Sequence, residues 1–90
     1  MKEIELRYVA HLTALTNETK EQFNSEVDTI RELISQLNEK YPGFEEIFVQ
    51  PLTGRINFNA MIYYSERGDV PVSVIDLNHP IEDRSTITFW

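Results

Sequence analysis

The stretch that decides the fold is the ten-residue segment 81–90, which reads Ile81-Glu82-Asp83-Arg84-Ser85-Thr86-Ile87-Thr88-Phe89-Trp90. Its first four residues are typical of a polar turn. From Ser85 to Trp90 the side chains alternate, with Ile87 and Phe89 on one face and hydroxyl side chains between them. Since a period of two is the pattern of a half-buried strand, we predict a strand that packs Ile87 and Phe89 on the core.

The other strictly alternating segment lies near the beginning of the chain, over Glu3–Tyr8. Ile4, Leu6 and Tyr8 share its inner face, and charged residues fill the outer one. Because both alternating strands need a covered face and a neighbour, we expect them to lie side by side and parallel at the centre of a sheet.

One helix is predicted between these two strands. Apolar residues at i, i+3, i+4, i+7 and i+11 form a single stripe, and they are Ile30, Leu33, Ile34, Leu37 and Tyr41. Thr29 and Glu32 have the spacing of a capping box. Tyr41-Pro42-Gly43 ends the helix, because proline disfavours the helical conformation in the residue before it. A helix with one apolar stripe packs on one neighbour, which here is the sheet.

The remaining segments predict shorter elements. They are a hairpin loop over His11–Thr19, an edge strand over about Glu21–Val27, a short packed segment after Gly43 that ends at Pro51, a strand over Arg55–Tyr64 and a short strand over Val72–Ile75. In the strand over Arg55–Tyr64, one face is expected to carry Ile56, Phe58, Ala60, Ile62 and Tyr64.

This order predicts an α+β fold. The expected arrangement is a single β-grasp (ubiquitin-like) domain over residues 1–90, with a mixed sheet of four to five strands and one main helix packed on one face. A ferredoxin-like fold is the alternative, but it needs a second helix, and residues 65–80 contain too many glycine and proline signals to supply one.

Composition restricts the function. The chain has 90 residues, no cysteine and a net charge of −7, so disulfides and thiol chemistry are excluded and nucleic acid or an anionic membrane is not the expected partner. No segment approaches the roughly 20 apolar residues of a membrane span. The chain opens directly into a strand pattern without a signal peptide, and we expect a cytoplasmic protein.

No catalytic residue, cofactor or metal site is predicted. Asp76, His79, Glu82 and Asp83 are the only group that resembles metal ligands, but they lie in a turn, where aspartate usually serves Asx-turn hydrogen bonds. His11 and His79 are the only candidate bases near neutral pH, and neither belongs to a known catalytic motif. We interpret both as exposed or capping residues.

An interaction surface has better support. If Ile87 and Phe89 face the helix, Trp90 faces the other side of the sheet, and the residues of matching parity form an exposed patch with it. This patch would bind a protein partner and consists of Val9, Met61, Tyr63 and Trp90. The alternatives are that Trp90 folds over the sheet end to complete the core, or that the patch closes a homodimer.

Three segments carry a resemblance to a known family. They are Tyr8-Val9-Ala10-His11-Leu12-Thr13-Ala14-Leu15, Asp28-Thr29-Ile30-Arg31-Glu32-Leu33, and Leu77-Asn78-His79-Pro80-Ile81-Glu82-Asp83 with the strand Thr86-Ile87-Thr88-Phe89-Trp90 after it. Over nearly its whole length the chain resembles the MoaD/ThiS sulfur carriers, the ubiquitin-like proteins of molybdopterin synthase and thiamine biosynthesis.

The resemblance implies a non-enzymatic protein that docks on an E1-like adenylyltransferase or on a synthase large subunit. In that family a Gly-Gly tail follows the closing strand and carries the sulfur, whereas this sequence stops at Trp90. We therefore expect docking, but not sulfur transfer, from the chain as printed. Arg84-Ser85 also replaces a Gly-Asp pair, and because arginine resists a positive φ we expect a different turn there. The alternative is a tailless β-grasp module for binding or dimerisation, unrelated to sulfur transfer.

Overall fold

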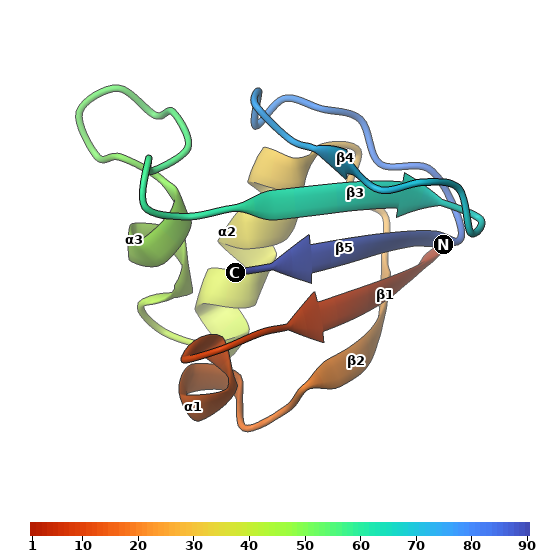
Figure 1. Ribbon diagram of the computed structural model, residues 1–90, viewed down its shortest axis with the longest axis horizontal. Helices are drawn as coiled ribbons and strands as arrows, with labels where there is room; N and C mark the ends of the chain where they lie inside the picture. The colour runs from red at the N-terminus through yellow and green to blue at the C-terminus, as the bar shows by residue number, and fades with distance from the viewer.

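The computed structural model describes all residues from Met1 to Trp90. Its centre is one five-stranded mixed sheet in the order β2-β1-β5-β3-β4 (Figure 1). The strands are β1 (Lys2–Tyr8), β2 (Lys20–Ser25), β3 (Ile62–Glu66), β4 (Val72–Ser73) and β5 (Ser85–Phe89). The helices are α1 (Leu12–Thr16), α2 (Ile30–Lys40) and α3 (Phe44–Phe48).

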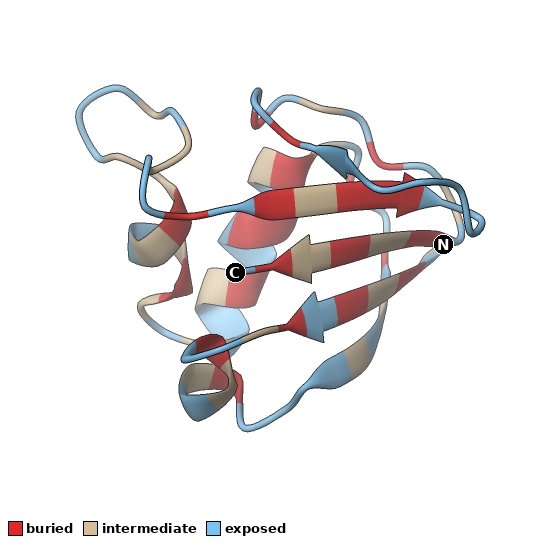
Figure 2. Cartoon of the chain, in the orientation of Figure 1, coloured by how far each residue is buried: buried red, intermediate tan, exposed pale blue.

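The predicted centre of the sheet is confirmed. β5 lies parallel to β1, with Leu6 opposite Ile87, and antiparallel to β3, with Tyr64 opposite Ile87. Burial alternates along β5, where Ser85, Ile87 and Phe89 are buried (Figure 2). This strand order, with one main helix on one face, is the β-grasp arrangement that the sequence predicts.

Helix α2 lies behind the sheet in Figure 1 and covers its inner face. The Thr29 hydroxyl accepts the amide N–H of Glu32 at 3.2 Å, as a capping residue does. Ile30, Leu33, Ile34 and Leu37 are buried, which confirms the predicted stripe. Gly43 takes a φ of 97°, and α3 begins directly after it, so the packed segment predicted here is a short helix.

The connection His11–Thr19 does join β1 and β2 as an antiparallel hairpin, as predicted, but it is not an irregular loop. It contains the five-residue helix α1, whose residues Leu12 and Thr16 are buried. Asn17 ends the helix in a left-handed conformation, with its N–H donated to the Thr13 carbonyl. A helix of little more than one turn gives too short a period to be read from sequence.

The predicted strand Arg55–Tyr64 is also wrong in its first half. Residues 49–57 fold back on themselves, with a bridge between Val49 and Ile56 and an N–H of Gln50 donated to the Arg55 carbonyl at 2.8 Å. Phe58, predicted to face the core, is 84% exposed. Strand β3 starts only at Ile62, because the preceding chain is already paired with itself.

The predicted edge strand and the predicted short strand both exist, but they end earlier than expected. β2 ends at Ser25 rather than Val27, and β4 ends at Ser73 rather than Ile75. Val27 is still buried, whereas Ile75 is exposed. Pairing, rather than apolar character, therefore sets where both strands end.

The turn before β5 contradicts a further expectation, because Arg84 does adopt a positive φ, of 64°. Its N–H donates to the Glu3 carbonyl at 2.9 Å, and its own carbonyl accepts the Arg67 N–H at 3.3 Å. Strand β1 and the turn after β3 therefore fix the backbone of Arg84, and they hold the arginine in a region that normally costs about 1–2 kcal/mol.

The helices are short, and none is long and apolar enough to cross a membrane.

Candidate interaction surface

The outer face of the sheet is the face that no helix covers, and it points toward the viewer in Figure 1. Cross-strand register on β1, β5 and β3 arranges its side chains in rows. From the C-terminal end of β5 backwards, these rows are Val9–Trp90–Met61, Arg7–Thr88–Tyr63 and Glu5–Thr86–Ser65. The face is therefore apolar at one end and polar at the other.

The apolar row continues the sheet beyond the ends of its strands. The N–H of Trp90 donates to the Met61 carbonyl at 2.9 Å, and the N–H of Val9 donates to the Phe89 carbonyl at 3.1 Å. The Tyr63 hydroxyl of the second row lies 3.5 Å from the Met61 sulfur. These contacts bring all four predicted residues, Val9, Met61, Tyr63 and Trp90, to one place; we call them the sheet-end patch.

Two members of the sheet-end patch are large and open to solvent. Met61 is 47% exposed and Trp90 is 42% exposed, whereas Val9 and Tyr63 are half-buried. The alternative in which Trp90 completes the core does not match this arrangement, because Phe89, which is fully buried, fills that position. The patch is thus an apolar surface next to the end of β5.

The polar rows of the same face are electrically balanced. Glu5 accepts from the Arg7 guanidinium at 2.7 Å and lies 3.9 Å from the Lys20 ammonium group. By contrast, Glu32, Glu39 and Glu46 on α2 and α3 are exposed. The excess negative charge of the chain thus lies partly on the helix side, away from the patch.

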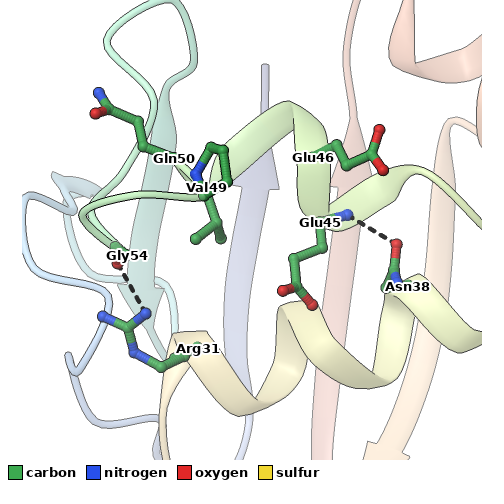
Figure 3. A pocket seen from close by; sticks show the side chains of 8 residues that line it. Arg31, Asn38, Glu45, Glu46, Val49, Gln50 and Gly54 are labelled. Carbon is green, nitrogen blue, oxygen red and sulfur yellow. Dashed lines mark hydrogen bonds between the residues drawn. The ribbon is translucent and has the colours of Figure 1, made fainter.

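The largest cavity lies on the helix side, between α2, α3 and the loop after α3 (Figure 3). It has a volume of about 630 Å³, and most of the side chains that line it are polar or charged. Arg31 at one end donates to the Gly54 carbonyl, and Asn38 at the other accepts the Glu45 N–H at 3.1 Å. The cavity therefore differs in chemistry from the apolar patch.

The turn residues considered as metal ligands are not brought together. Asp76 accepts the N–H of Asn78 at 2.9 Å, which is the Asx-turn role expected of it, and Asp83 accepts the N–H of Glu3 at 2.8 Å. No group of three or more histidine or carboxylate side chains is close enough to hold a metal ion. His79 packs on Tyr64 with ring centroids 4.6 Å apart, and His11 is exposed at the start of α1.

Sequence reasoning missed one polar cluster, which ties the edge strand β2 to the core. The carboxylate of Glu21 accepts the hydroxyls of Tyr8 and Tyr41, each at 2.8 Å, and pairs with Lys40. Burial raises the pKa of Glu21, but hydrogen bonds from Lys40, Tyr41 and Tyr8 outweigh burial and hold that pKa below its usual value. Burial and the same carboxylate raise the pKa of both tyrosines.

No family model and no curated protein sequence matches the chain. Solved structures do match. A putative molybdopterin converting factor, subunit 1, from Pyrococcus furiosus aligns with a TM-score of 0.70 and 14% identity, over 99% of this chain and 95% of its own. The fold is a ubiquitin-like β-grasp.

Two Haloferax volcanii structures give the same β-grasp. The HVO 2177 protein aligns with a TM-score of 0.76 and 13% identity, over 98% of this chain and 80% of its own. SAMP1, a small archaeal modifier protein, aligns with a TM-score of 0.69 and 13% identity, over 98% and 92%. The resemblance to MoaD-like proteins is therefore confirmed at the level of the fold, which is all that identities this low show.

Proposed function

We propose that this chain is a single-domain, non-enzymatic β-grasp protein of the cytoplasm, and that it acts by docking on a larger protein through the sheet-end patch. An E1-like adenylyltransferase, or the large subunit of a synthase, is the partner that the resemblance to sulfur carriers implies.

The observation that carries the proposal is the row Val9–Trp90–Met61, in which large apolar side chains stand exposed beside the end of the central strand. Exposed aromatic and methionine side chains grouped in this way are typical of the centre of a protein interface. The neutral, ion-paired rows next to the patch suit the polar rim of the same interface.

Two versions of the chain separate docking from chemistry. One ends at Trp90, and the other carries Gly-Gly after Trp90. Each is incubated with ATP and an E1-like enzyme from the same genome, and binding and mass are measured in parallel. We expect both versions to bind, and only the extended version to gain an AMP adduct. In the sulfur-carrier family the E1-like enzyme adenylates the terminal carboxylate, and the tail reaches the enzyme through a narrow channel in which any side chain would clash, so the tail must be glycine.

Three outcomes would count against the proposal. Binding that is unchanged in Tyr63→Ser and in Met61→Gln would exclude the patch as the docking surface. An AMP adduct on the version that ends at Trp90 would contradict the need for a glycine tail. If the E1-like enzyme does not bind and the free chain elutes as a dimer that Tyr63→Ser dissociates, the patch serves self-association instead.

A further inference from the structure

A second cavity lies beside the large one and shares Arg31 and Gln50 with it. It has a volume of about 430 Å³, and it is bounded by the start of α2, the loop 50–56 and the turn before Asn78. Its lining includes the two arginines Arg31 and Arg55. In a chain with eight basic and fifteen acidic residues, two guanidinium groups in one cavity require an explanation.

The guanidinium of Arg31 is held in place without being neutralised. Its Nε donates to the side-chain carbonyl of Asn78 at 3.1 Å, and its Nη1 donates to the backbone carbonyl of Gly54 at 2.8 Å (Figure 3). Both acceptors are uncharged, and no carboxylate lies within ion-pair distance. Three of its five N–H groups remain available, in a fixed orientation.

Arg55 is exposed, and its guanidinium makes no hydrogen bond or ion pair within the chain. One carboxylate, that of Asp76, lines the same cavity, and it already accepts the N–H of Asn78. Two guanidinium groups against one carboxylate leave the cavity with a positive charge, although the chain as a whole is strongly negative. This contrast favours an anionic ligand.

Apart from these charged residues and Gln50, the lining is apolar, and this apolar part indicates what chemistry the rest of the ligand has. The apolar wall consists of Ile56, Ile75 and Leu77; Leu77 is only 1% exposed, whereas Ile75 is 84% exposed. A free phosphate ion gains nothing from such a wall. A carboxylate attached to an apolar residue satisfies the guanidinium groups by charge-assisted hydrogen bonds and covers the exposed isoleucine.

We propose that this cavity binds the terminal carboxylate of a partner polypeptide whose last residue is apolar. Arg31 and Arg55 contact the carboxylate, and Ile56 and Ile75 of the apolar wall contact the last side chain. The site lies on α2, on the opposite side of the sheet from the sheet-end patch, so both surfaces can be occupied at once.

The test uses N-acetyl-leucine, which carries a carboxylate and an apolar side chain on one carbon atom. It is titrated into the ¹⁵N-labelled chain near neutral pH while the arginine Nε signals and the amides of Gly54, Ile56 and Leu77 are followed by NMR. We expect saturable shifts at these positions. The uncharged N-acetyl-leucinamide should produce none, and inorganic phosphate should bind more weakly.

Two arginine variants serve as a matched pair. Arg55→Gln removes an exposed side chain that holds nothing in the fold, and it should weaken binding of N-acetyl-leucine by about threefold, the loss expected for one exposed charge contact. Arg67→Gln removes another arginine without an ion pair and should change nothing, because Arg67 lies in the turn after β3, outside the cavity. Equal shifts with the amide, equal weakening in both variants, or phosphate binding as tightly as N-acetyl-leucine would overturn the proposal.

Discussion

Phe89 and Trp90 are adjacent in sequence, but at the same end of the sheet their side chains lie on opposite faces. Phe89 is fully buried, and its ring lies 5.0–6.2 Å from those of Phe48, Phe44 and Tyr8. Trp90 stands on the outer face, 42% exposed. The difference shows that the pleat of the strand, rather than hydrophobicity, decides which aromatic residue stabilises the fold and which is free to meet a partner.

The largest expected effect tests the role of the buried residue, Phe89. Phe89→Ala should lower the free energy of unfolding by about 3–5 kcal/mol, because it leaves a cavity among packed rings on a central strand. Trp90→Ala should cost several-fold less, and chemical denaturation measures both. Equal losses in the two variants would mean that Trp90 belongs to the core, and the comparison would fail.

The next effect concerns the polar cluster under the edge strand. Glu21→Gln should lower stability at neutral pH by about 1–2 kcal/mol, because the carboxylate accepts two phenol hydroxyls and pairs with Lys40. Glu39→Gln, on the exposed face of α2, is the matched control and should have little effect.

The Glu21→Gln substitution also predicts how the free energy of unfolding depends on pH. The pKa of Glu21 in the folded chain lies below its ordinary value of 4.5, so the carboxylate contributes stability above that value and loses the contribution as the pH falls through the folded pKa. Denaturation curves should therefore show the wild type and Glu21→Gln converging as the pH is lowered below 4.5. A gap that stays constant down to acid pH would rule out this assignment.

A smaller effect, of opposite sign, is expected at the far end of the outer face. Arg84→Gly should raise the free energy of unfolding by about 0.5–1 kcal/mol, because glycine adopts a φ of 64° without the clash of a β-carbon. Arg84→Ala keeps the β-carbon and should give no gain. If alanine stabilises the chain as much as glycine does, the arginine side chain, rather than the backbone conformation, is responsible.

The smallest effect tests the exposed outer face of the sheet, on which Trp90 and Met61 lie. Met61→Gln should change the free energy of unfolding by no more than about 0.5 kcal/mol, since the side chain is 47% exposed. The adjacent Ile62→Ala should cost about 2–5 kcal/mol, because Ile62 is fully buried. Thermal denaturation of the pair measures the contrast, and a large loss in Met61→Gln would place Met61 with the core.

Local patterns predicted the parts of the molecule that depend on period alone. The alternation of Ile4, Leu6 and Tyr8 and that of Ile87 and Phe89 gave the two central strands and their inner faces. The stripe of α2 and the cap at Thr29 gave the main helix. The parity of Met61, Tyr63 and Trp90 was enough to group them with Val9, and the structure brings these four residues together.

The predictions from the sequence fail where pairing between distant residues competes with the local pattern. Ile56 and Phe58 alternate as a strand would, but the bridge between Val49 and Ile56 turns this segment back on itself. The network around Glu21 joins residues from three elements, and no spacing in the sequence indicates it.

The sequence by itself determined the β-grasp and the inner faces of β1 and β5, because periods of two and of 3.6 are properties of neighbouring residues. The tertiary structure alone decided the conformation of Arg84, which hydrogen bonds with β1 and with the turn after β3 impose against its own preference. It also decided that Arg31 and Arg55 share a cavity, since they come from a helix and a loop that meet only when the chain is folded.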